Sequence, residues 1–134
     1  MTNTLGQLAL VVRDYDEAID FYTRVLDFEL LEDTPLSETK RWVRVRPRGG
    51  ATGAGLLLAR AANDEQRQAI GNQCGGRVFL FLYTDDFTTY YQRLLDHEVT
   101  IIRPPEDHPY GRVAVFADCY GNLWDLIQPR PPRS

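Results

Sequence analysis

The sequence has few of the residues that build metal centres, disulfide frameworks or phosphate sites. Only two cysteines and two histidines occur in 134 residues, and Cys74 and Cys119 have no spacing typical of a metal site. Motifs of the forms Cys-x-x-Cys, His-Glu-x-x-His and Gly-x-Ser-x-Gly are missing, as is a glycine-rich phosphate loop. The sequence therefore gives no support to the common metalloprotease, serine hydrolase or nucleotide-binding chemistries.

Long runs of a single kind of residue are also missing. The basic residues form no long run and the formal net charge is −4, which argues against nucleic acid as the main partner. The apolar run near the N-terminus, Leu8 to Val12, is too short for a signal peptide or a membrane span. We therefore expect a cytoplasmic protein that binds neither nucleic acid nor membrane, and we expect both cysteines to be free thiols.

The first half of the chain alternates strand and helix patterns. Residues 7–12 predict a strand, and Asp14 with Glu17 forms a capping box at the start of a helix. Apolar residues follow at helical spacing: Ala18, Phe21, Tyr22, Val25 and Leu26. Residues 28–31, 42–46 and 56–59 predict three more strands, and residues 63–71 predict a short helix capped by Asn63.

The same order of elements then occurs a second time. Residues 79–86 match residues 7–14, a helical pattern follows, and residues 99–102 predict the next strand. Pro104-Pro105 is interpreted as a loop, and Val113 and Val115 are matched to Val43 and Val45. The sequence thus predicts one domain, 1–128, made of two modules at about 5–60 and 76–128. An extended Pro/Arg tail is expected at 129–134.

Asp125 is the most informative polar residue, because it lies among large apolar residues in the final strand pattern, Leu-Trp-Asp-Leu-Ile. An unpaired carboxylate in such surroundings costs several kcal/mol, so it must be neutralised, paired or used. Two alternatives stay open: Asp125 pairs with Arg44 or Arg112, or it takes part in binding.

Strand alternation separates the side chains that pack under the helices from those on the opposite face. With Val43, Val45, Val113 and Val115 under the helices, the other face is predicted to carry aromatic residues and a few polar groups. This lining suits a small-molecule pocket. Its predicted members are Gln7, Trp42, Arg44, Phe79, Phe81, Arg112, Phe116 and Asp125, with Tyr110 at the mouth.

The duplicated pattern, with VRDYDEAIDFYTRVL and YGRVAVFADCYGNLWDLIQ, resembles the vicinal oxygen chelate superfamily. That superfamily includes glyoxalase I, bleomycin-resistance proteins and extradiol dioxygenases. The resemblance covers about residues 5–128. It implies an α+β fold in which two βαβββ modules form a cupped mixed sheet, with helices on the outer face and the ligand in the hollow. It also implies a homodimer.

The resemblance further implies where a metal would bind. In metal-dependent members the ligands project from the first and last strands of the modules, positions matched here by Gln7, Leu57, Phe79 and Asp125. Leu57 and Phe79 cannot bind a metal, and two remaining ligands rarely hold one tightly. We therefore expect no cofactor, although a divalent metal at Gln7 and Asp125 stays possible.

Three hypotheses for function follow. The first is a metal-independent binder of a small, aromatic organic molecule, of the bleomycin-resistance type. The alternative is a metal-dependent lyase, isomerase or dioxygenase that uses Gln7 and Asp125 in an incomplete site; whether the protein is an enzyme is left open, and Asp125 is the best catalytic candidate. In the third, aromatic side chains fill the hollow and the chain is only a dimerising partner.

Overall fold

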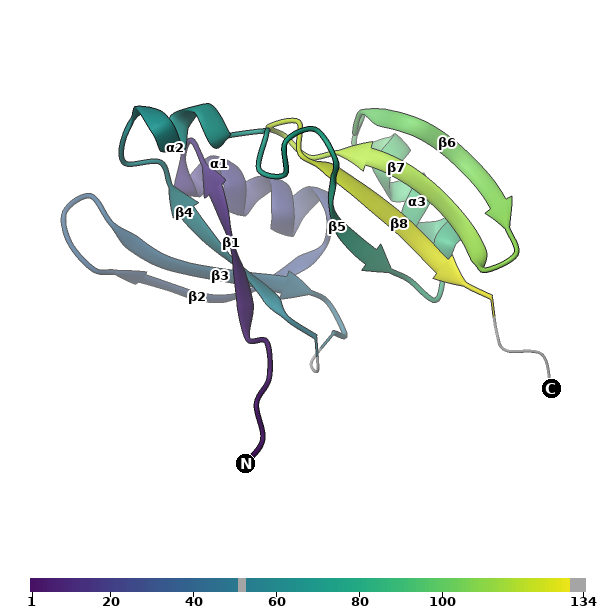
Figure 1. The fold of residues 1–134 in the computed structure, drawn as a ribbon, viewed down its shortest axis with the longest axis horizontal. Coiled ribbons are helices and arrows are strands. Elements are labelled where there is room, and N and C mark those ends of the chain that lie inside the picture. The colour runs from purple at the N-terminus through teal and green to yellow at the C-terminus, as the bar shows by residue number, and fades with distance from the viewer. Residues whose placement is uncertain (51–52, 131–134) are drawn as a thin grey trace. The chain divides into compact units, whose positions relative to one another are not determined.

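The computed structural model describes residues 1–50 and 53–130 and divides the chain into two compact units, Met1–Ile70 and Gly71–Ser134. Each unit has a four-stranded mixed sheet with helices outside it, so the predicted α+β class is confirmed (Figure 1). Residues 131–134 of the predicted tail lie outside the described residues.

The first unit holds its sheet in the order β1-β4-β3-β2. Strands β1 and β4 run parallel, whereas β4, β3 and β2 pair antiparallel. The elements are β1 (Gln7–Val12), α1 (Tyr15–Asp20), the π-helical segment η1 (Phe21–Val25), β2 (Phe28–Pro35), β3 (Arg41–Pro47), β4 (Gly55–Arg60) and α2 (Asp64–Ala69).

The second unit repeats this topology with the order β5-β8-β7-β6, in which β5 and β8 are parallel. Its elements are β5 (Val78–Tyr83), α3 (Phe87–Asp96), β6 (Ile101–His108), β7 (Gly111–Ala117) and β8 (Leu123–Pro129). The predicted duplication of strand, helix and three strands is therefore present.

The main helices begin in the same way in both units. The carboxylate of Asp14 accepts a hydrogen bond from the Glu17 N–H at 2.9 Å, and Asp86 accepts one from the Thr89 N–H at 3.2 Å. Such caps satisfy backbone N–H groups that lack a partner inside the helix. Asn63 caps α2 by the same contact, as predicted.

The helix-facing side of the first sheet forms its core. Leu10, Val43, Val45 and Leu58 are fully buried there, as is Tyr22 of the helical segment. The opposite, open face carries a row in which Ala9 pairs with Leu57, and Leu57 with Arg44. The predicted alternation of β1, β3 and β4 is confirmed.

The predicted faces of β7 are wrong by one residue. Phe116 is fully buried and pairs with Trp124, whose ring stacks against it at 6.0 Å. Val115 instead pairs with Asp125, on the open face. Both alternating sets of side chains along β7 are mainly apolar. The set that contains the Phe116 ring lies in the core, because an aromatic side chain buries more apolar area than a valine.

Strand β6 also differs from the prediction. Pro104 and Pro105 lie inside this strand rather than in a loop. Because β6 is at the edge of its sheet, the missing proline N–H groups cost few ladder bonds, and the register shifts around them.

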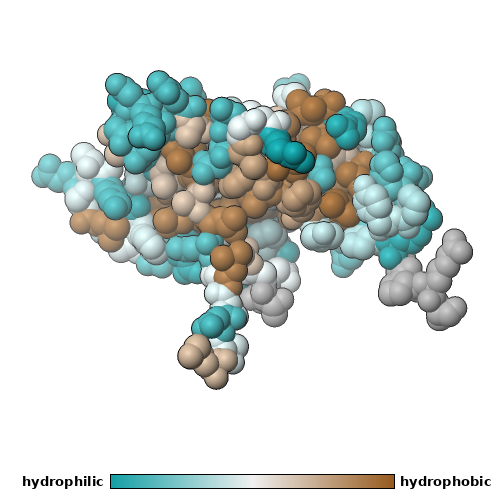
Figure 2. Space-filling view, in the orientation of Figure 1, coloured by the Kyte–Doolittle hydropathy of each residue, from teal (hydrophilic) through white to brown (hydrophobic). Residues whose placement is uncertain are grey.

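Figure 2 shows hydrophilic residues gathered over α2 of the first unit and over the β6–β7 hairpin of the second. Within the described residues, no helix is both long and apolar enough to span a membrane.

Candidate functional site

Asp125 opens onto a hollow of about 460 Å³ in the second unit. The lining is mostly aromatic and apolar: Phe81, Tyr83, Tyr110, Asp125, Ile127 and Pro129. Phe81, Tyr83 and Tyr110 are 54%, 65% and 61% exposed, so their rings leave the hollow open and remain free to contact a ligand. Three of the predicted site residues, Phe81, Tyr110 and Asp125, are thus brought together here.

The register of the sheet places Asp125 in a row across all four strands. Asp125 on β8 pairs with Phe81 on β5 and with Val115 on β7, and Val115 pairs with Arg103 on β6. The turn before β8 fixes this position. In that turn Asp118 accepts hydrogen bonds from the N–H groups of Tyr120 and Asn122 at 2.9 and 2.8 Å.

Tyr110 reaches the hollow from the turn between β6 and β7. The next residue, Gly111, has a φ of 155°, and a Cβ there would collide with the Gln128 carbonyl oxygen, so only glycine fits. His108 stacks on the Tyr110 ring, with centroids 5.2 Å apart and planes 6° from parallel. These contacts support the ring from one side.

The Asp125 carboxylate is half-buried and has no hydrogen bond or ion pair with any residue in 1–50 or 53–130. Burial raises its pKa above the ordinary value, and the positive charge of Arg103 partly offsets that effect. A carboxylate that is partly desolvated and lacks a direct partner is suited to binding a positive group.

Arg112 and Phe116 are not part of this hollow, and both site predictions are wrong. The Arg112 guanidinium lies 5.9 Å from the Phe87 ring centre of α3 and donates to Asp107 at 2.8 Å. Phe116 is in the core. Both errors follow from the wrong assignment of the two faces of β7. Because Arg112 lies on the helix-facing side of the sheet and Asp125 on the open face, the predicted pair of Asp125 and Arg112 is also wrong.

Phe79 belongs to another part of the second unit. It lies at the shift in the β5–β8 register, between Val78 and Leu80, and lines a small hollow with Leu123 and most residues of 71–77. The other β5 aromatic residues, Phe81 and Tyr83, reach Asp125 instead.

The open face of the first unit brings three of the predicted site residues, Gln7, Trp42 and Arg44, together around a shallow hollow. Here the polar groups are paired. Arg44 Nε donates to Gln7 Oε1 at 2.9 Å, and Arg44 Nη1 lies 3.6 Å from Glu32 Oε1. Arg44 therefore has partners within its own unit.

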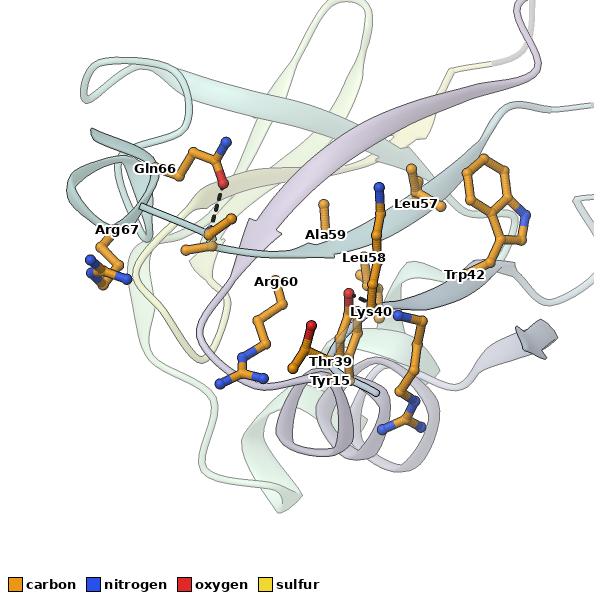
Figure 3. A pocket seen from close by; sticks show the side chains of 13 residues that line it. Tyr15, Thr39, Lys40, Trp42, Leu57, Leu58, Ala59, Arg60, Gln66 and Arg67 are labelled. Carbon is orange, nitrogen blue, oxygen red and sulfur yellow. Dashed lines mark hydrogen bonds between the residues drawn. The ribbon is translucent and has the colours of Figure 1, made fainter. Parts of the chain in front are cut away.

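A larger cavity of about 600 Å³ lies at the end of β4, where β3 and α2 begin (Figure 3). Sequence reasoning missed most of its lining, which includes Lys40, Arg41, Arg60 and Arg67. Strand alternation gives no information on side chains at the ends of strands, where most of these residues lie.

The residues at the matched metal positions do not fit a metal centre. Leu57 and Phe79 offer no ligand atom, and the Gln7 oxygen already accepts the Arg44 hydrogen bond. Among the described residues, no group of three or more His, Cys, Asp and Glu side chains is arranged to hold a metal ion. Catalytic metal sites commonly use three protein ligands.

Comparisons with known proteins agree with this fold. An uncharacterized protein of Shewanella frigidimarina is 57% identical over 129 residues, covering 96% of this chain and 95% of its own. The crystal structure of UcmS2 superimposes with a TM-score of 0.81 at 28% identity, covering 95% of this chain and 98% of its own. TnmS3, an antibiotic binding protein from Streptomyces sp. CB03234, has a TM-score of 0.75 at 30% identity, covering 96% and 98%. Residues 4–126 match the model of the Glyoxalase/Bleomycin resistance protein/Dioxygenase superfamily, and the chain belongs to that superfamily.

Proposed function

We propose that this protein binds a small organic molecule, without a metal, in the hollow around Asp125. The ligand would carry a positively charged group on an aromatic or apolar body. The observation that carries the proposal is the half-buried Asp125 carboxylate, which has no direct partner among the described residues and is surrounded by Phe81, Tyr83 and Tyr110.

The charge of the ligand follows from the groups around Asp125. Arg112 lies on the helix-facing side of the sheet, and Arg103 acts only through its charge, beyond ion-pair distance. An organic cation would pair with the carboxylate and meet the electron-rich faces of the aromatic rings. The three exposed rings also offer apolar area to the rest of the molecule.

Two findings support binding without a metal. The matched metal positions hold two apolar residues, and the Gln7 oxygen is engaged by Arg44.

TnmS3, a structural neighbour at 30% identity, is an antibiotic binding protein, so small-molecule binding is known for a protein of this fold.

The proposal can be tested with phenyltrimethylammonium and its neutral isostere, tert-butylbenzene. We expect the cation to bind more tightly in a fluorescence or NMR titration, and Asp125→Asn to remove that preference while the neutral compound binds as before. Equal binding of both compounds to the wild-type protein would overturn the assignment of charge.

Calorimetric titration with zinc, nickel and iron(II) tests the metal-free part. We expect no stoichiometric tight binding by the wild-type protein. Micromolar or tighter binding that is lost in Asp125→Ala would instead establish a metal site and favour an enzyme.

A further inference from the structure

The cavity at the end of β4 concentrates positive charge in a protein of net negative charge. Among the described residues that line it, four are cationic and none is acidic, although the formal net charge of the chain is −4. The cationic residues are Lys40, Arg41, Arg60 and Arg67. The cavity shares no residue with the hollow around Asp125.

Two of these cations are held by carboxylates and serve the structure. Arg41 donates to Asp33 at 2.6 and 3.0 Å and to Asp16 at 3.0 Å, and its guanidinium lies 5.2 Å from the Tyr15 ring centre. The hydrogen bonds to Asp33 raise the pKa of Arg41 most. Arg67 pairs with Asp64 one turn earlier in α2. Their charge is largely neutralised within the fold.

Lys40 and Arg60 differ, because neither side chain has a hydrogen bond or an ion pair within 1–50 and 53–130. Figure 3 shows the Lys40 amino group on the side of β4 that carries Leu57 and Ala59, and Arg60 on the side of Tyr15 and Thr39. Lys40 therefore lies over the apolar part of the cavity, and Arg60 adds positive potential from the other side of the strand.

The apolar part of the cavity suits a flat ligand. Leu57 and Ala59 are two residues apart on β4, so both lie on the open face. Trp42 shares that face because it is two residues from Arg44, which pairs with Leu57. All three side chains line the cavity. The Trp42 side chain is only partly buried, so its ring can contact a bound molecule.

We infer that this cavity is a second binding site, for a small organic anion such as an aromatic carboxylate or sulfonate. The acidic group would meet the Lys40 ammonium, and the apolar body would lie on Trp42, Leu57 and Ala59. Arg60 strengthens the attraction without touching the acidic group.

Lys40 is the only lysine in the sequence, which gives the test its precision. Anilinonaphthalene sulfonate serves as the anionic probe and phenylnaphthylamine as its uncharged counterpart, both titrated into the full chain by fluorescence. We expect the sulfonate to bind more tightly, and Lys40→Gln to weaken it by about fivefold to tenfold. Lys40→Arg should retain binding because it keeps the charge, whereas Arg60→Gln should weaken it less than Lys40→Gln.

A second readout locates the probe. Reductive methylation with isotope-labelled formaldehyde leaves one lysine methyl signal in the NMR spectrum, distinct from that of the N-terminus, and keeps the positive charge. The sulfonate should shift this signal in a saturable manner. Unchanged sulfonate affinity in Lys40→Gln, or a methyl signal that does not respond at saturation, would overturn the inference. A loss of affinity in Lys40→Gln together with a saturable shift would establish the site.

Discussion

The open faces of the two sheets have the same topology and opposite chemistry. In the first unit the central row places Arg44 on β3 beside Leu57 on β4. In the second unit the corresponding strands place Val115 beside Asp125. Arg44 is paired with Gln7 and Glu32, whereas Asp125 has no direct partner among the described residues. The duplication therefore preserved the scaffold and not the binding groups.

The comparison also separates polar groups that stabilise the fold from those available to a ligand. Arg41 and Arg44 hold neighbouring strands together through carboxylate or amide partners. Asp125 and Lys40 each line a cavity without such a partner in the described chain. We interpret the second pair as the groups that select ligands, one for positive charge and one for negative charge.

The largest effect is expected from the residue that defines which face of the second sheet is core. Phe116→Ala should lower the free energy of unfolding by about 3–5 kcal/mol, because it empties a fully buried ring site. Phe81→Ala, on the open face of the same sheet, is the matched control and should change stability by less than about 1 kcal/mol. Chemical denaturation measures both. Similar losses in the two variants would mean that β7 and β8 do not have the register described.

The next effect concerns binding. Asp125→Leu makes the second unit resemble the first, where Leu57 occupies the corresponding place. We expect affinity for phenyltrimethylammonium to fall by about tenfold to a hundredfold, since a charged hydrogen bond or ion pair in a partly desolvated site is lost. The reciprocal change, Leu57→Asp, should weaken binding of the sulfonate probe in the first unit. Unaltered cation affinity in Asp125→Leu would remove Asp125 from the site.

A smaller effect is expected on stability. Because the folded state raises the pKa of Asp125, the ionised carboxylate disfavours folding above that pKa, and the penalty disappears as the pH falls below the ordinary value for aspartate. Asp125→Asn should therefore be more stable than the wild type at neutral pH, and the difference should shrink on acidification. Thermal unfolding across this range is the measurement. A variant that is less stable at neutral pH would show that the carboxylate has a stabilising partner.

The smallest effect should come from the paired polar groups of the first unit. Arg44→Gln removes a half-exposed contact with Glu32 and the hydrogen bond to Gln7, so we expect a loss below about 1 kcal/mol. The unfolding free energy at low and high salt checks this. A loss several times larger would indicate that Arg44 has a greater structural role than its partial exposure suggests.

The sequence predicted well where polar and apolar residues alternate strictly. Trp42-Val43-Arg44-Val45 can place its valines in the core in only one way, and the structure agrees. Asp125 was recognised because a carboxylate between Trp124 and Leu126 must lie on the face opposite those buried side chains.

Prediction failed where both alternating sets are apolar. In β7, Val113 and Val115 compete with Ala114 and Phe116, and only the packing of Phe116 on Trp124 decides between them. Lys40 escaped notice because it lies one residue before β3, where the path of the chain rather than alternation decides which cavity a side chain lines.

Titration of the Asp125 side chain, followed by NMR with and without phenyltrimethylammonium, shows whether this carboxylate binds the cation. In the free protein we expect a pKa above the ordinary value of aspartate, because the carboxylate is partly buried. The bound cation should lower that pKa by favouring the ionised form. A pKa at or below the ordinary value that does not respond to the cation would show that Asp125 already has a partner, and would contradict the proposed site.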